Sequence, residues 1–206
     1  MTGSSAASPA RLNPTLWLGF GLVIAAAVWL GVALTHSPGA DSLHFLNRWL
    51  VRVSLPFFML AFSASSWARL WPSPFTRRLL RERRGLGLAW AAIHLTHAAA
   101  ILVLFESTDE TRDAVTLVAG GLGFLVTGAM ALTSNDAAVR CLGPRNWLLL
   151  HRFGIRYLMF IYLFTYAGAV AGGESGWKVV ALSLLLALVG LRVAAGLKAR
   201  GALRRG

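Results

Sequence analysis

The sequence predicts an all-α membrane protein with six transmembrane helices, and two observations support this prediction. Hydrophobic residues make up 56% of the 206 residues and charged residues only 14%, whereas soluble domains carry about 25% charged residues. Apolar segments also recur at the length of about 20 residues that a spanning helix needs. They cover residues 15–35, 49–68, 86–105, 114–133, 153–172 and 177–197. Because a backbone in lipid must pair its polar groups internally, we expect helices in an up-and-down bundle.

The chain is expected to form one transmembrane domain over residues 15–197. Residues 1–14 are polar and rich in small side chains, which favours a disordered N-terminal segment. Residues 198–206 hold four basic residues and are expected to form a basic tail. Cys141 is the single cysteine, so neither an intrachain disulfide nor a thiolate metal cluster is expected.

The net charge of +12 is distributed unevenly along the chain. Basic residues gather between the second and third apolar segments, around the start of the fifth, and after the sixth. The segment 106–113 instead holds four acids and one arginine. By the positive-inside rule both termini are expected in the cytoplasm, with 36–48, 106–113 and 172–178 outside a cytoplasmic (inner) membrane. Anionic lipid head groups then account for the basic loops, and no nucleic-acid partner is expected.

Three histidines are candidates for chemistry within this bundle. His97 follows Arg84 by thirteen residues, which is about 19 Å along a helix, and so lies near the middle of a hydrocarbon layer about 30 Å thick. His94 shares its helical face, and His151 begins the fifth apolar segment near the cytoplasmic interface. A titratable ring at membrane depth indicates a functional site, most often a metal or haem-iron ligand.

Two motifs place these histidines in a known pattern. The first is RRGLGL at 83–88 followed by His97; the second is Thr133-Ser134 followed by LGPRNWLLLHR at 142–152, which contains His151. Together they resemble the ferric-reductase-like transmembrane domain family, most closely its bacterial YedZ/MsrQ branch of haem-binding membrane subunits of periplasmic methionine sulfoxide reductase systems. The resemblance covers roughly residues 45–170. It implies a b-type haem with His97 and His151 as iron ligands, and we expect His97 to matter most and His94 least.

One departure from the family pattern bears on the number of haems. The family carries a further histidine thirteen residues after the one that matches His151, where this chain has Phe164. Because thirteen residues span about 19 Å of helix, His151 cannot oppose His97 across one haem. A five-coordinate haem at His97, help from His94 through altered helix geometry, and absence of the deep haem all remain open. We expect one haem b, with a second possible, and expect Phe164→His to supply a deep ligand if the fifth helix rotates locally.

The basic residues beside these motifs have two interpretations. Arg83, Arg84, Arg152 and Arg156 can bind the two propionates of a haem, or can serve only to set the topology. The resemblance implies passage of electrons across the membrane to an outward-facing redox partner, such as a periplasmic reductase. A quinol or a cytoplasmic flavin reductase would be the donor.

The chain has no nucleotide-binding motif and no assigned catalytic residue. We therefore expect an electron-transfer subunit of an oxidoreductase system rather than a self-contained enzyme. Two alternatives remain: a structural or assembly subunit without haem, and a small proton-coupled transporter that uses His94 and His97.

Overall fold

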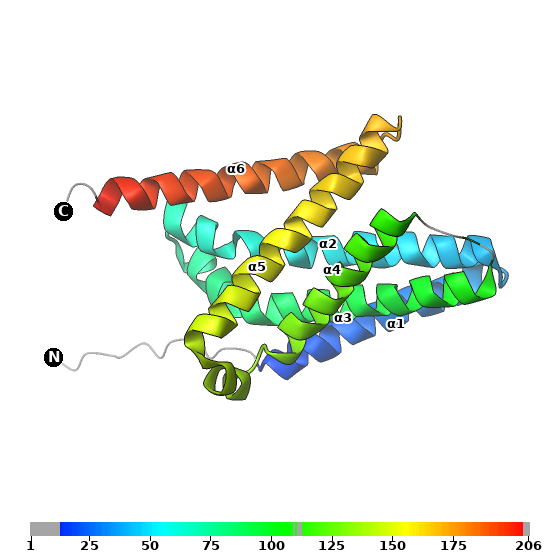
Figure 1. Ribbon diagram of the computed structural model, residues 1–206, viewed down its shortest axis with the longest axis horizontal. Helices are drawn as coiled ribbons and strands as arrows, with labels where there is room; N and C mark the ends of the chain where they lie inside the picture. Colours follow the sequence, from blue (N-terminus) through cyan, green and yellow to red (C-terminus); the bar gives the residue numbers. More distant parts are fainter. Residues whose placement is uncertain (1–12, 109, 111–112, 204–206) are drawn as a thin grey trace.

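The computed structural model describes residues 13–108, 110 and 113–203, and among these it contains six helices and no strand (Figure 1). All six are long and apolar enough to cross a membrane, which confirms the all-α six-helix prediction. The helices are α1 (Pro14–Thr35), α2 (Ala40–Leu70), α3 (Pro74–Ser107), α4 (Ala114–Leu132), α5 (Asp136–Ala171) and α6 (Trp177–Leu203).

Several helices extend well beyond the apolar segments. The expected basic loop between the second and third segments is mostly helical, because α2 ends at Leu70 and α3 already begins at Pro74. Ser73 caps α3 by accepting a hydrogen bond from the Thr76 amide, and Pro74 stands in the first turn, where its missing N–H costs nothing. Residues 198–203 of the expected tail continue α6, while most of the expected N-terminal segment lies outside the described residues.

The α5 helix consists of two segments joined at Gly143. The backbone of Gly143 has φ 76° and ψ 149°, a left-handed region that glycine adopts without a Cβ penalty. Pro144 then starts the longer segment, with its fixed φ suited to a first helical position. This break separates the short segment that begins at Asp136 from the membrane-spanning segment that carries His151.

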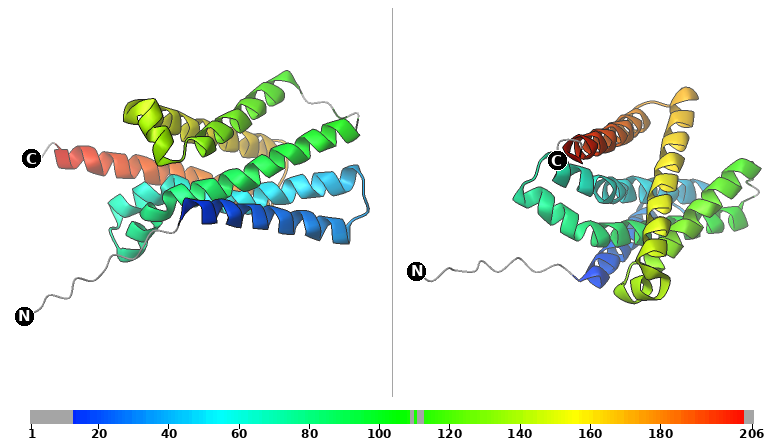
Figure 2. Two further views of the ribbon diagram at one scale, coloured as in Figure 1. Left: turned by 90° about the horizontal axis from the view of Figure 1, so that it is seen from below. Right: turned by 60° about the vertical axis from the view of Figure 1, so that its left-hand side comes forward.

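The helices form a bundle in which α5 is strongly tilted (Figures 1 and 2). The α5 and α6 helices meet where Ala171 leads towards Trp177 and separate towards their other ends. A buried aromatic core that includes Phe58, Trp90 and Tyr162 joins α2, α3 and α5. The tilt of α5 therefore separates the backbones of α5 and α6 at one end of the bundle.

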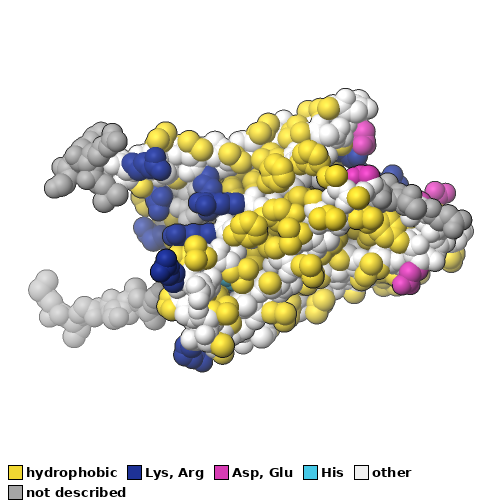
Figure 3. Space-filling model, viewed as in Figure 1, with side chains coloured by type: hydrophobic (Ala, Val, Ile, Leu, Met, Phe, Trp, Pro, Cys, Tyr) yellow, Lys and Arg dark blue, Asp and Glu magenta, His cyan; other side chains and the backbone are white. Residues whose placement is uncertain are grey.

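Charge differs between the two ends of the bundle. We call the end where α1 begins and α6 ends the basic end, and the opposite end the acidic end. Figure 3 shows most of the visible Lys and Arg side chains at the basic end and the visible Asp and Glu side chains at the acidic end, with hydrophobic side chains between them. Asp113 lies at the acidic end, where it caps α4. Hydrogen bonds from the hydroxyl and amide of Thr116 hold the pKa of the Asp113 carboxyl below its usual value. The acidic end therefore keeps this negative charge at neutral pH.

The α1 and α3 helices pack closely against each other at Gly21. A Cβ at Gly21 would lie 2.5 Å from the Ala89 carbonyl oxygen and 2.9 Å from the Ala89 Cα, both backbone atoms that cannot turn aside. Gly21→Val should therefore push α1 from α3 and destabilise the protein by about 1–3 kcal/mol. Thermal unfolding in detergent measures this, with Gly19→Val as the control, because nothing lies within 4 Å of a Cβ there. Equal melting of the two variants would contradict this packing.

Candidate functional site

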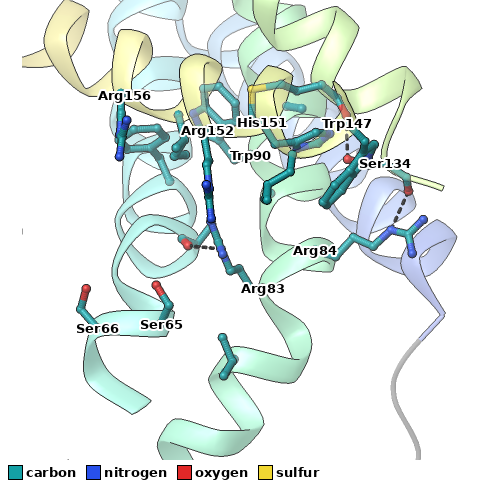
Figure 4. A pocket seen from close by; sticks show the side chains of 18 of the residues that line it. Ser65, Ser66, Arg83, Arg84, Trp90, Ser134, Trp147, His151, Arg152 and Arg156 are labelled. Carbon is teal, nitrogen blue, oxygen red and sulfur yellow. Dashed lines mark hydrogen bonds between the residues drawn. The ribbon is translucent and has the colours of Figure 1, made fainter. Parts of the chain in front are cut away.

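A cavity of about 940 Å³ opens at the basic end among α2, α3, α4, α5 and α6 (Figure 4). Its volume falls in the range of sites that hold small molecules and cofactors. Aromatic side chains from three helices form part of its wall: Phe58, Trp90 and Trp147. The lining also includes His151 and six arginines: Arg69, Arg83, Arg84, Arg152, Arg156 and Arg192.

His151 is held in a fixed orientation at this cavity. Its ring stacks on Trp147 with centroids 4.2 Å apart, and its Nε2 lies 3.2 Å from the Thr133 hydroxyl oxygen. That hydroxyl donates to the Ala129 carbonyl oxygen at 2.7 Å, so it accepts the bond from His151. Within the described part of the chain the Nδ1 atom of His151 has no hydrogen-bond partner. One imidazole nitrogen is therefore held by the protein and the other is left for a ligand.

Two of the cavity arginines are anchored to neighbouring helices. Arg84 donates through Nε to the Ser134 carbonyl oxygen at 2.7 Å and forms an ion pair with Asp136 at 2.8 Å. Arg83 donates through Nε to the Ala61 carbonyl oxygen at 3.0 Å. These bonds tie α3 to the start of α5 and to α2, so both guanidinium groups are positioned before any ligand binds.

The remaining charge of the cavity is largely uncompensated. Arg152 and Arg156 are exposed, and no carboxylate of the described residues lies within 4.0 Å of either. Arg192 donates to the Phe62 carbonyl oxygen at 3.2 Å and lies 4.5 Å above the Phe62 ring. Asp136 is the one carboxylate in the described lining. The cavity is therefore suited to an anionic or carboxylate-bearing ligand.

The other two candidate histidines do not line this cavity. His97 Nδ1 lies 2.9 Å from Asn47 Oδ1, and Asn47 donates through Nδ2 to the Leu43 carbonyl oxygen at 2.9 Å. Nδ1 of His97 therefore carries the proton, and its Nε2 is left with a lone pair. His94 packs between Trp90 and Phe124, each with ring centroids 5.0 Å from its own. Its Nδ1 is buried and has no hydrogen-bond partner among the described residues.

Phe164 faces away from these histidines. Its side chain is 64% exposed and stacks on Phe160, also on the outer face of α5. Tyr162 instead occupies the inner face, where its hydroxyl accepts a hydrogen bond from Trp90 Nε1 at 3.1 Å and its ring lies 5.9 Å from that of His94. Thirteen residues advance a helix by about 220° beyond whole turns, which explains the outward position. The local rotation of α5 that Phe164→His would need in order to supply a deep ligand is therefore not seen in this structure.

The cavity residues fit one haem. The volume, the aromatic walls, the free nitrogen of His151 and the guanidinium groups match a flat macrocycle that carries one iron and two carboxylates. No group of three His, Cys, Asp or Glu side chains in the described residues could hold a bare metal ion. The motif spacing favours His97 as the main ligand, whereas the position of the cavity favours His151.

Sequence reasoning missed three residues around these sites. Arg192 had a usable signal, because it is an arginine inside the apolar segment 177–197. Asn47 and Asp136 had none, since only the packing of the helices brings them to His97 and Arg84.

The fold and the cavity define a class: a six-helix membrane protein with a cationic, cofactor-sized cavity at one end. No family model matches the chain, and no solved structure matches it. The resemblance to the ferric-reductase-like family therefore rests on the two sequence motifs.

Proposed function

We propose that this chain is a b-type haem membrane protein that passes electrons across the cytoplasmic membrane to an outward-facing redox partner. The observation that carries the proposal is His151, which lines a cofactor-sized cavity rich in guanidinium groups and has one imidazole nitrogen without a hydrogen-bond partner among the described residues. The motif resemblance supports the same cofactor. Haem, when bound, supplies the one-electron chemistry that no side chain here can supply.

The protein residues have separate roles in this proposal. His151 would bind the haem iron, and the Thr133 hydroxyl fixes the ring by holding its Nε2 atom. Arg83 and Arg152 would bind the propionates, because guanidinium groups pair well with carboxylates. Phe58, Trp90 and Trp147 wall the cavity and would contact the macrocycle.

The electron donor and acceptor belong to other proteins or to the lipid phase. The proposed donor is a quinol or a cytoplasmic flavin reductase at the basic end. The proposed acceptor is a periplasmic reductase at the acidic end, to which Asp113 contributes negative charge.

Two linked measurements test this function. The purified protein should show a Soret band, and vesicles containing it should reduce trapped ferricyanide when an impermeant reductant is added outside. Haem without reduction of the trapped ferricyanide would refute electron passage. Absence of a Soret band from protein produced with ample haem would favour the structural or assembly subunit.

The His94–His97 pair favours a second candidate, a proton-coupled transporter. The two rings lie 5.7 Å apart at membrane depth, and the Nδ1 of His94 is buried without a partner among the described residues. Intramembrane histidine chains are typical of proton relays. If this candidate is correct, vesicles that contain the protein should show proton-coupled transport. His94→Ala should abolish this transport, and protein free of haem should retain it.

The orientation of the chain is testable without any cofactor. In a Cys141→Ser background, Ser107→Cys lies at the acidic end and Gly201→Cys at the basic end. The charge bias predicts that an impermeant maleimide labels only the former in intact cells, because the basic end faces the cytoplasm. Labelling of Gly201→Cys alone would reverse the orientation and with it the direction of electron flow.

A further inference from the structure

Two arginines flank the opening between α5 and α6. Arg156 belongs to α5 and Arg192 to α6, and both line the cavity where these helices separate (Figures 1 and 2). Arg83 of α3 lines the same cavity, so three cations from three helices share this region. Figure 3 shows basic side chains gathered at this end of the molecule.

Among the described residues, Arg156 and Arg192 have no carboxylate partner. Arg192 is half-buried, and its described contacts are the carbonyl oxygen and the ring of Phe62, both uncharged. No carboxylate of the described residues lies within 4.0 Å of Arg156 or Arg192. A buried charge without a partner is costly, and an arginine in an apolar segment commonly marks a ligand or lipid site. An anion that reaches both groups would remove this cost.

We propose that the opening between α5 and α6 binds an anionic phospholipid, whose phosphate contacts Arg156 and Arg192. A phospholipid fits the surroundings, because apolar side chains within four residues of Arg156 and Arg192 are exposed on both helices and available to acyl chains. They include Phe153 and Phe160 of α5 and Val193 of α6. Basic pockets between transmembrane helices are known to bind such head groups. The lipid site opens into the same cavity as the proposed haem site, but it uses Arg156 and Arg192 rather than His151, Arg83 and Arg152.

Native mass spectrometry of delipidated full-length protein tests the proposal with phosphatidylglycerol and phosphatidylcholine as probes. Wild-type protein should retain one phosphatidylglycerol in preference to phosphatidylcholine. Arg156→Gln should weaken this binding about tenfold or more, because a charge-assisted hydrogen bond is lost. Arg156→Lys should weaken it less, since the charge remains. Arg140→Gln is the matched control, because Arg140 is exposed on α5 and does not line the cavity.

Arg192→Gln on α6 should weaken the binding of phosphatidylglycerol in the same way. Arg192→Lys keeps the charge, so it shows whether a loss of binding comes from the lost guanidinium group or from misfolding. Equal retention of the two lipids, or Arg156→Gln and Arg192→Gln behaving like Arg140→Gln, would overturn the proposal. Inorganic phosphate that binds with the same arginine dependence while phosphatidylglycerol does not would assign the site to a soluble phosphate. His151→Ala should lose haem and keep the lipid, so a failure of the haem proposal can be told from a failure of this one.

Discussion

Substitution of His151 by alanine should remove nearly all bound haem. His151 brings the one imidazole that lines the cavity, and its ring is oriented by Thr133 and Trp147. Loss of a residue that merely orients a metal ligand costs about 10–100-fold in metal affinity, so loss of the ligand itself should cost at least about 100-fold. The haem-to-protein ratio, measured by the pyridine haemochrome of purified protein, gives the result directly.

Two histidine variants serve as controls for this experiment. His36→Ala changes a residue at the end of α1 that bonds to Thr35, and it should leave the haem content unchanged. His97→Ala should also retain most haem, because His97 does not line the cavity. If His97→Ala lost the haem while His151→Ala kept it, the iron would lie at mid-depth, as the motif spacing alone indicates.

Trp90→Ala should produce the largest loss of stability. Trp90 is 3% exposed, donates to the Tyr162 hydroxyl at 3.1 Å and contacts the rings of Phe58 and His94 at 5.3 and 5.0 Å. Truncation of a buried tryptophan typically costs about 3–5 kcal/mol through lost contacts and the void left behind. It would also remove a wall that the cavity shares with the deep histidines.

Denaturant unfolding followed by tryptophan fluorescence or circular dichroism measures this change. Trp90→Phe should lose less, because most of the ring volume remains. Trp71→Ala changes a residue that is 55% exposed and should have little effect. A Trp90→Ala variant as stable as Trp71→Ala would show that the aromatic core does not hold α2, α3 and α5 together.

The sequence predicts the existence of the six helices better than it predicts the residues at which they begin and end. Apolar segments of spanning length locate all six helices, because lipid imposes both length and internal hydrogen bonding. Hydropathy marks only the part of a helix within lipid, so the arginine-rich start of α3 was expected to be a loop. Its boundary was available from a different signal, the Ser73 cap followed by Pro74.

The candidate site could be predicted only in part. The residues His151, Arg83, Arg84, Arg152 and Arg156 were singled out from sequence, and they meet at one cavity. The outward direction of Phe164 could be predicted, because thirteen residues do not complete whole helical turns and Phe164 therefore cannot share a helix face with His151. The exclusion of His94 and His97 from the cavity depends on the packing of Trp90, Phe124 and Tyr162 around them, and no sequence pattern encodes that packing.

The central claim, one haem held by His151, is tested most directly by haem stoichiometry combined with electron paramagnetic resonance of the ferric protein. A single imidazole ligand predicts about one haem b per chain with a high-spin ferric signal, because the described residues offer no second imidazole at the cavity. Protein without haem, or with two low-spin bis-histidine haems per chain, would contradict the account.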